Sequence, residues 1–230
     1  MSKNGKIVNR ICSFVIRQRR LTYQQKFTLQ KLWPNLGVNY TDQLLSFDRL
    51  FCNIAPIILE IGFGIGTSLI YTAQQNSTKN FLGIEVYTPG VIKCLLSAHN
   101  YNLNNLRIIC HDAIEVLEKM IPNNSLNMVQ LFFSDPWPKK RHHKRRLVQP
   151  YFAKLILHKL ELGGVFHIAT DWYPYANHIL DVMCQISNYK NLSVSGNYIE
   201  RPVTRPMTKF EMKGKKLGHK IFDLMFKKIK

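Results

Sequence analysis

Five acidic side chains stand at or just after the ends of apolar runs in this chain. They are Glu60, Glu85, Asp112, Asp135 and Asp171. The chain has only 14 acidic residues, so composition alone does not explain this placement. Ligands of open α/β sheets bind at the carboxyl ends of the strands. Aspartate also caps helices, which accounts for about two of the five. The pattern therefore predicts a polar ligand surrounded by carboxylates.

A glycine-rich bend follows the first of these carboxylates. The segment LEIGFGIGTS is typical of a strand, a tight turn and a helix start, and its glycines let a ligand approach the backbone closely. A dinucleotide fingerprint that begins at Gly62 would have its third glycine at position 67, which is Thr67 here. The GxGxG form preceded by Glu60 instead resembles the first motif of S-adenosylmethionine methyltransferases.

Two further carboxylates suit a nucleoside. Glu85 ends the second apolar run, where an acid accepts hydrogen bonds from both ribose hydroxyls of NAD or of S-adenosylmethionine. Asp112 ends the third run, and in methyltransferases an acid at this point meets the adenine amino group. We interpret the neighbouring His111 as a structural or loop histidine.

The segment LFFSDPWPKKRHHKRR is the most specific in the chain. The apolar run Met128–Phe133 delivers Asp135 to the ligand edge of the sheet. Pro136 and Pro138 fix φ on either side of Trp137, which predicts a stiff loop holding an acid and an aromatic ring. We expect Asp135 to be the catalytic carboxylate.

A run of positive charge follows this loop at once. Its cations are Lys139, Lys140, Arg141, Lys144, Arg145 and Arg146. Beside an acid–aromatic loop, such a run indicates binding of nucleic-acid phosphates more than a plain solvated surface. That binding weakens by roughly 0.7–0.9 log units per tenfold salt for each contact. No acid or cysteine accompanies His142 and His143 at ligand spacing, so we expect no metal site.

The elements that position these residues follow from the apolar pattern. Continuous apolar runs of strand length are Ile57–Ile61, Phe81–Val86, Leu106–Cys110, Met128–Phe133 and Val165–Ala169. Such runs suit strands buried on both faces, with crossover helices between them. Helices are predicted to open at Thr88–Pro89, Pro150 and Pro174, the second ending at Gly163–Gly164. The alternation predicts a Rossmann-like, doubly wound, mostly parallel α/β sheet, closed by strands in NLSVSGNYI and KIFDLMFKKI.

The first 41 residues differ in texture from the rest. They are polar and basic and contain no acid, and TYQQKFTLQKLW predicts one short helix between a Thr22 cap and Pro34. We therefore expect a basic N-terminal extension at 1–41 and a methyltransferase domain at 42–230. Basic residues also crowd the tail from Arg201 to Lys230. With 32 Lys+Arg against 14 Asp+Glu, the formal net charge of +18 predicts a polyanionic partner.

Other features of the composition indicate the cellular compartment in which the protein is expected. The five cysteines form no CxxC pair, which excludes a typical zinc or disulfide framework and suits a reducing compartment. The segment MSKNGKIVNR lacks a signal-peptide core, and no apolar run is long enough to span a bilayer. We expect a soluble, cytoplasmic protein that binds no membrane. The oligomeric state stays open, with a monomer favoured.

The segment DPWPKKRHHKRR closely resembles the signature of the bacterial tRNA (guanine-N7)-methyltransferase family, whose members modify guanine 46 in the variable loop of tRNA. The resemblance extends over nearly the whole chain. It includes SFVIRQRRLTYQQ, LEIGFGIG, FLGIEVY, ATDWYPYA and RPVTRPMTKFEMKGKKLGHKIFDLMF. It implies a class I methyltransferase fold, S-adenosylmethionine as cofactor and tRNA as partner.

The resemblance also assigns residues. The cofactor site would contain Glu60, Gly62, Gly64, Gly66, Glu85, Asp112 and Asp135. Substrate contacts would come from Lys139, Asp171, Thr208, Lys209, Phe210 and Glu211. RNA contacts would come from Arg141, His142, His143, Lys144, Arg145 and Arg146. Ser134 departs from the proline expected before Asp135, which loosens the loop slightly and leaves the acid in place.

Guanine N7 carries an exposed lone pair and needs no deprotonation to attack a sulfonium methyl. No cysteine stands near the active loop to form a covalent adduct. Catalysis would then be mainly positioning, with a carboxylate stabilising the charge that develops on the purine. Asp135 or Asp171 would do this or would accept hydrogen bonds from the guanine edge. Trp137 would either stack on the base or be structural.

Three alternatives remain open on the residues alone. An amino-group methyltransferase is one, because DPW is similar to acid–proline–aromatic loops, although those have consecutive prolines. A non-catalytic RNA-binding module is another, and the complete set of cofactor carboxylates speaks against it. A nicotinamide oxidoreductase fits the glycine spacing least well.

Overall fold

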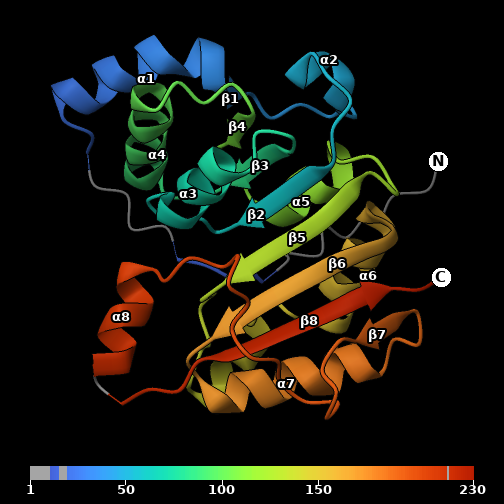
Figure 1. The fold of residues 1–230 in the computed structure, drawn as a ribbon. Helices are drawn as coiled ribbons and strands as arrows, with labels where there is room; N and C mark the ends of the chain where they lie inside the picture. The colour runs from blue at the N-terminus through green and yellow to red at the C-terminus, as the bar shows by residue number, and fades with distance from the viewer. Residues whose placement is uncertain (1–10, 16–19, 217) are drawn as a thin grey trace, which may run out of the picture.

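One mixed sheet forms the centre of the molecule (Figure 1). The computed structural model describes residues 11–15, 20–216 and 218–230, and in this part of the chain the sheet has eight strands in the order β1-β4-β3-β2-β5-β6-β8-β7. The strands are β1 Gly37–Val38, β2 Ile57–Ile61, β3 Asn80–Ile84, β4 Leu106–Ile109, β5 Leu126–Phe132, β6 Leu160–Thr170, β7 Tyr189–Asn191 and β8 Phe222–Lys228. The helices are α1 Tyr23–Leu36, α2 Phe47–Phe51, α3 Thr67–Gln75, α4 Thr88–Asn100, α5 Ala113–Lys119, α6 Pro150–Lys159, α7 Tyr173–Cys184 and α8 Lys209–Lys216, with a 3₁₀ turn η1 at Lys140–Arg145.

The predicted doubly wound, Rossmann-like sheet is confirmed. Six neighbouring strands, β1 to β6, are parallel, whereas β8 pairs antiparallel with β6 and with β7. The chain moves outward from β2 through β3 to β4 and then returns to place β5 beside β2. The strand order therefore reverses between β2 and β5, and the carboxyl ends at such a reversal are the usual ligand site of this architecture.

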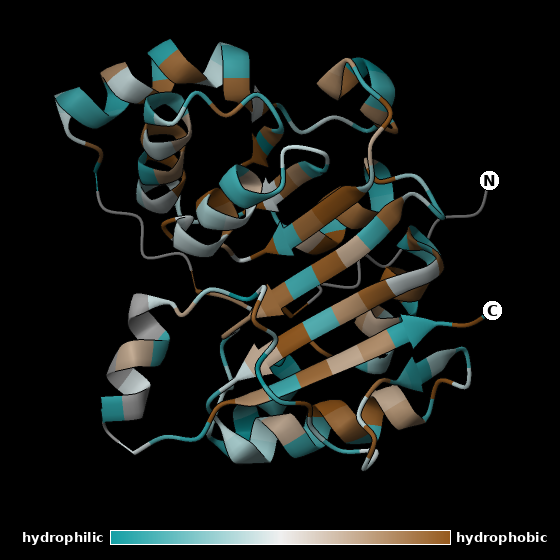
Figure 2. Cartoon of the chain, viewed as in Figure 1, coloured by the Kyte–Doolittle hydropathy of each residue, from teal (hydrophilic) through white to brown (hydrophobic). Residues whose placement is uncertain are grey.

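The sheet separates two apolar cores, as the continuous apolar strands require. In β2, Leu59 packs into a core shared with α5, α6 and α7, whereas Ile58 faces the core shared with α1, α3 and α4. Figure 2 shows the hydrophobic colour concentrated along the central strands. Burying a side chain such as Leu59 contributes roughly 1.5–3 kcal/mol. The two cores thus fix the carboxyl ends of β2 and β5 side by side.

The apolar runs predicted the inner strands closely, and the predicted run Ile57–Ile61 coincides with β2. The prediction that α6 ends at Gly163–Gly164 is wrong, because α6 ends at Lys159 and both glycines lie within β6. The pairing of β5 with β6 shifts register between Leu126 and Met128. Gly163 has φ of 84°, a conformation that glycine adopts without strain, so the glycines form a bulge instead of a helix end.

Two predicted helix ends also differ in detail. Thr22 caps α1 with the reciprocal Gln25 bond, as expected, but the helix continues past Pro34 to Leu36. It closes through the Gly37 N–H, which donates to the carbonyl of Trp33. Thr88 is the first residue of α4 and makes no cap, since Tyr87 takes that position.

Of the two strands predicted near the C-terminus, only one forms. KIFDLMFKKI forms β8 as predicted, but NLSVSGNYI forms no full strand: β7 ends at Asn191, and only Ile199 makes an isolated bridge, to Asp223. At the other end of the chain, β1 pairs with β4 and α1 packs against α4. α8 lies beyond the arrowheads of β5 and β6 (Figure 1).

Candidate active site

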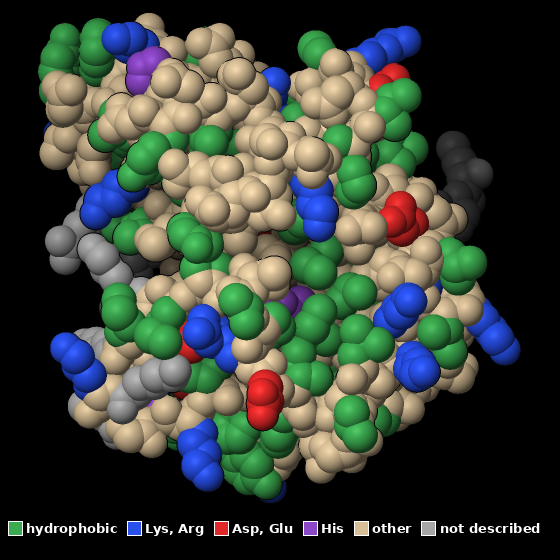
Figure 3. Space-filling view, viewed as in Figure 1, with side chains coloured by type: hydrophobic (Ala, Val, Ile, Leu, Met, Phe, Trp, Pro, Cys, Tyr) green, Lys and Arg blue, Asp and Glu red, His purple; other side chains and the backbone are tan. Residues whose placement is uncertain are grey.

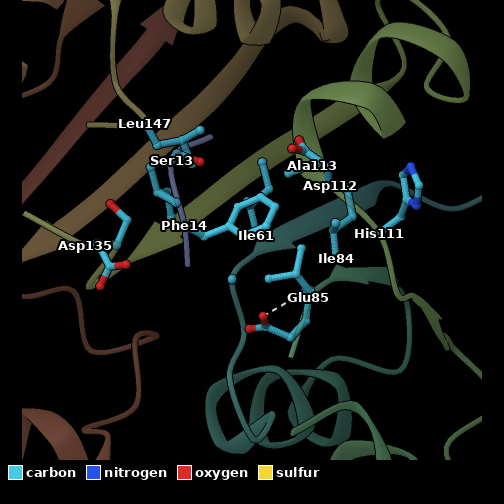
Figure 4. Close-up of a pocket in the computed structure, with 14 residues that line it drawn as sticks. Ser13, Phe14, Ile61, Ile84, Glu85, His111, Asp112, Ala113, Asp135 and Leu147 are labelled. Atoms are coloured by element: carbon cyan, nitrogen blue, oxygen red, sulfur yellow. Dashed lines mark hydrogen bonds between the residues drawn. The ribbon is translucent and has the colours of Figure 1, made fainter. Parts of the chain in front are cut away.

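A cavity lies at the carboxyl edge of the sheet where the strand order reverses. Gly62, Glu85, Asp112 and Asp135 all line it, and Figure 4 shows the three carboxylates around the end of β2. A second cavity shares Gly62 and is lined by Glu60, Gly64 and Thr208, among others. The glycine bend and the Asp135 loop thus lie on the same side of the sheet, as a transfer between their ligands requires.

The glycine bend exposes backbone to these cavities. Its three glycines have φ of 72°, 60° and 81°, which disfavours any side chain. A Cβ added at Gly62 or Gly64 would meet nothing within 4 Å, whereas one at Gly66 would lie 2.3 Å from Cys94 Sγ. Gly62 and Gly64 therefore leave room for a ligand, and Gly66 lets α3 pack against α4.

Glu85 holds the bend in shape. Its Oε2 accepts a hydrogen bond from the Gly64 N–H at 2.8 Å, and its Oε1 accepts from the N–H groups of Val86 and Tyr87 at 2.7 and 2.9 Å. Three backbone donors fix the carboxylate at the cavity wall. Such a fixed acceptor suits ribose hydroxyls, and the predicted contact of Glu85 with a ribose stays a prediction.

Glu60 is the unusual carboxyl of the site. It is 3% exposed, and its Oε2 has no hydrogen-bond partner among the described residues. Burial, and then the nearby charge of Glu85, raise the pKa of Glu60 to about 8. Unpaired buried oxygens are rare because they lose water without compensation. The site therefore provides an acceptor for a donor or cation in the second cavity.

Asp112 has two functions in this geometry. Its Oδ1 accepts a hydrogen bond from the Ile114 N–H at 2.8 Å and so caps α5, while the residue also lines the first cavity. The neighbouring His111 pairs with Glu115 at 2.6 Å and stacks on Tyr40 with ring centroids 3.8 Å apart. These contacts hold the ring in place, but His111 also lines the first cavity, so its interpretation as a purely structural histidine stays a prediction.

The loop that carries Asp135 is backbone-strained on both sides. Phe133 and Trp137 have φ of 55° and 45°, which is uncommon for residues with large side chains. Asp135 is exposed toward the cavity mouth, but partial burial of its carboxyl still raises its pKa. Trp137 donates from Nε1 to the Ser13 carbonyl at 2.9 Å, and the Arg145 guanidinium lies over its ring. These contacts favour the structural role of Trp137.

The basic run forms the turn η1 and its flanks. Lys139, Lys140, Arg141 and Lys144 are exposed, and His142, His143 and Arg145 are partly exposed. Arg146 differs, contrary to expectation: it is 4% exposed and donates from Nε to the Pro136 carbonyl at 2.9 Å. It does not belong to the exposed cationic surface, because its chain segment turns inward after η1.

The substrate-binding residues predicted near the C-terminus differ in where their side chains lie. Thr208 lines the second cavity and accepts a hydrogen bond from the Glu211 N–H at 3.1 Å. Glu211 itself is fully buried, and both of its oxygens accept from Arg205 at 2.7 and 3.2 Å, contrary to the expectation that it faces substrate. The side chains of Lys209 and Phe210 lie outside the described part of the structure.

Sequence reasoning missed the group that anchors this segment. Arg205 also binds Asp223 at 2.7 and 2.8 Å, and Asp223 pairs with His167 at 2.8 Å. All are almost completely buried. The available signal was an aspartate and a histidine inside two apolar strands, because buried charges need partners. Together with Arg205 these residues tie α8 to the sheet.

Asp171, the remaining strand-end acid, follows β6 but lines neither cavity. Its Oδ2 lies 3.4 Å from His219 Nδ1. In the described residues no group of three His, Cys, Asp or Glu side chains could hold a metal ion. Across the same residues, no helix combines the length and apolar character needed to cross a bilayer.

The chain resembles known proteins over nearly its whole length. Residues 54–224 match the family model described as putative methyltransferase. A tRNA (guanine-N(7)-)-methyltransferase of Photorhabdus laumondii is 58% identical over 99% of this chain and 95% of its own length. The protein of that name from Escherichia coli K12 is 57% identical over the same shares.

Solved structures agree on the fold. The 16S rRNA methyltransferase KamB superposes with a TM-score of 0.59 at 14% identity, covering 80% of this chain and 93% of that one. A SAM-dependent O-methyltransferase from Thermotoga maritima gives 0.51 at 12% identity, covering 94% and 69%. These likenesses show the class I methyltransferase fold, and the sequence relatives show the family. The chain belongs to the tRNA (guanine-N7)-methyltransferase family.

Proposed function

We propose that this protein transfers a methyl group from S-adenosylmethionine to N7 of guanine 46 in the variable loop of tRNA. The observation that carries the proposal is the common cavity of Glu85, Asp112 and Asp135 beside an exposed cationic turn. The cavity suits a small nucleoside, and the turn suits phosphates. The names of the relatives above support methylation of guanine N7 in tRNA.

The donor groups of the two cavities fit the parts of S-adenosylmethionine. Glu85 would accept hydrogen bonds from the ribose hydroxyls, and Asp112 would accept one from the adenine amino group. Glu60 has a buried oxygen for which the described residues offer no hydrogen-bond partner, and a cationic or N–H-bearing methionine end would supply one. The open space at Gly62 and Gly64 admits the ligand against the backbone. When bound, S-adenosylmethionine supplies a methyl group activated on a sulfonium.

Asp135 is the proposed catalytic residue. It lines the cofactor cavity and begins the loop that leads to the cationic turn. A carboxylate there would stabilise the positive charge that N7 alkylation places on the purine, or would accept hydrogen bonds from the guanine N1–H and amino group. The second function disfavours adenine by about 1–3 kcal/mol. Because N7 needs no general base, the protein mainly orients the guanine.

The tRNA would be held by the exposed cations of the turn. Lys139, Arg141, Lys144 and Arg145 are the proposed phosphate contacts, with His142 and His143 beside them. Lys139, Asp171 and Thr208 are proposed near the guanine. Such a substrate implies a cytoplasmic protein, with residues 1–41 as a basic extension that adds to the RNA surface. A monomer is the proposed state.

The decisive experiment uses two unmodified tRNA transcripts that differ only at position 46. Each is incubated with the protein and S-adenosylmethionine labelled in the methyl group. Label in the guanine 46 transcript, cleavage there by 7-methylguanine-specific chemistry, and no label in the adenine 46 transcript are expected. Nucleoside mass spectrometry that found the methyl on an exocyclic amino group would replace this proposal with the amino-group alternative.

A further inference from the structure

The last arginine of the basic run has contacts unlike those of its neighbours. Arg146 is 4% exposed, and its Nη2 is buried without a hydrogen-bond partner among the described residues. Burial lowers the pKa of its guanidinium. Lys144, two residues earlier in the chain, is exposed. A phosphate can reach Lys144 directly, but it cannot reach Arg146 without rearrangement of the loop.

The contacts of Arg146 point to the Asp135 loop. Its Nε donates to the Pro136 carbonyl at 2.9 Å, one residue beyond Asp135. Its guanidinium lies over the Tyr175 ring, 5.3 Å from the centroid. The Tyr175 hydroxyl in turn lies 3.3 Å from Ser134 Oγ, one residue before Asp135. Arg146 and Tyr175 therefore contact the residues immediately after and immediately before Asp135.

The backbone conformation of this loop requires stabilising contacts on both sides of Asp135. Phe133 and Trp137, on either side of the Ser134–Pro136 stretch, are held in the left-handed region. This conformation is unfavourable for a residue with a side chain, and it persists only where the surroundings fix it. The Phe133 N–H donates to the Ala169 carbonyl, and the Trp137 ring is anchored at Ser13. Arg146 supplies the remaining hold, on the peptide that joins Pro136 to Trp137.

Tyr175 connects this hold to the body of the protein. It is fully buried on α7, and its hydroxyl accepts a hydrogen bond from the Val148 N–H at 3.3 Å. Leu147, between Arg146 and Val148, lines the cofactor cavity together with Asp135 (Figure 4). The segment 146–148 thus links the cavity wall, the rigid helix α7 and the strained loop.

We propose that Arg146 is a positioning residue that holds the Asp135 loop in its strained shape, and not a contact to RNA. This inference rests on the proposed function, because it assumes that Asp135 acts on a guanine and that the exposed cations bind tRNA. The basic run then has two separate functions. Its exposed residues bind the tRNA, and its last residue, Arg146, fixes the conformation of the Asp135 loop.

The test compares Arg146→Gln with Lys144→Gln, which removes one charge from the exposed turn, and with Lys154→Gln, an exposed site on α6. Arg146→Gln is expected to lower kcat on the order of 10- to 100-fold with little change in KM for tRNA. Lys144→Gln is expected to raise KM and to reduce the salt dependence of binding by roughly 0.7–0.9 log units per tenfold salt. Lys154→Gln is expected to match the wild type. A rise in KM without a loss of kcat in Arg146→Gln would overturn the proposal.

Hydrogen exchange gives a second readout that needs no substrate. The amides of Ser134, Asp135 and Trp137 are expected to exchange faster in Arg146→Gln and at the wild-type rate in Lys144→Gln. Unchanged exchange in Arg146→Gln would overturn the proposal even if the wild-type protein methylated no tRNA, so the two failures are distinguishable. If Arg146→Gln does not fold, Arg146→Lys decides: a several-fold lower kcat at constant KM supports the proposal, and a wild-type kcat contradicts it.

Discussion

Glu60 places a proton-binding carboxyl, 3% exposed, beside the glycine bend. Its pKa of about 8 in the folded protein lies above the 4.5 of an unperturbed glutamate. The folded state therefore keeps a proton that the unfolded state has already released between these values. The stability that Glu60 contributes is complete below pH 4.5 and is lost as the pH rises through about 8.

Glu60→Gln is expected to remove this pH dependence. Because the wild type loses this contribution as the pH rises and the variant does not, the unfolding free energy of the variant minus that of the wild type should increase between about pH 5 and pH 8. Urea unfolding at several pH values measures the difference. Glu200→Gln, at an exposed glutamate, is the control and should show no such trend. A constant difference between Glu60→Gln and wild type would mean that Glu60 is ionised throughout.

The charge of Asp135 is expected to matter more than its size. Asp135→Asn keeps the shape of the side chain but removes the carboxylate that faces the cavity. Single groups that stabilise developing charge are worth roughly 10²–10³-fold in kcat, and we expect a loss in that range. Single-turnover methylation of tRNA measures it, with the exposed Asp181→Asn as control. Full activity of Asp135→Asn would transfer the role to another carboxylate, with Asp171 the first to examine.

At the scale of elements, a buried group of ion pairs ties α8 to the sheet. Arg205 joins Glu211 of α8 to Asp223 of β8, and its guanidinium also lies over Phe132 and Phe133, 5.7 and 5.8 Å from the ring centroids. Burial opposes ionisation of Asp223, but hydrogen bonds from His167 and Arg205 outweigh it and lower its pKa. Thr208, at the start of α8, is thereby set at the wall of the second cavity.

Arg205→Met is expected to be severely destabilising, because it removes the buried cation that joins the carboxylates of Glu211 and Asp223. Breaking a buried ion pair from one side costs about 3–5 kcal/mol of unfolding free energy. Chemical unfolding monitored by circular dichroism measures the loss. Lys220→Met, in the exposed segment before β8, is the control and should stay within about 0.5 kcal/mol of wild type. A similarly small effect of Arg205→Met would show that the group is not cooperative.

For the whole molecule, the positions of the basic side chains matter more for binding a polyanion than the net charge of +18 itself. Figure 3 shows basic side chains spread around one face with few acids between them. Such a field attracts tRNA from any side, but only contacts made in the complex determine the slope of binding with salt. The exposed turn next to the cavity is the expected centre of those contacts.

A triple variant tests this expectation. Replacing Lys139, Lys140 and Lys144 by glutamine should lower the salt slope of tRNA binding by roughly 2 log units per tenfold salt. The control replaces the exposed Lys154, Lys190 and Lys230, which changes the net charge equally but at other surfaces. Filter binding over a salt series measures both. Equal slopes in the two triple variants would place the tRNA elsewhere on the protein.

By itself, the sequence determined the sheet architecture, its inner strands, and the edge at which Glu85, Asp112 and Asp135 meet, but not β1 or the strand expected in NLSVSGNYI. Continuous apolar runs form buried strands in whichever fold contains them, and an acid after a strand lies at its carboxyl end because chain direction fixes that end. Local pattern also identified the glycine bend and the DPWPKK loop. The boundary after residue 41 stays a prediction, although β1 before it pairs with β4.

Only the tertiary structure decided which charges face the ligand and which lie buried. Arg145 and Arg146 are adjacent and chemically equal, yet one lies on Trp137 and the other beneath the Asp135 loop. Glu211 binds Arg205 because strand β8 brings Asp223 to the same place. Burial depends on contacts between segments far apart in the chain, and local spacing carries no information about those distances.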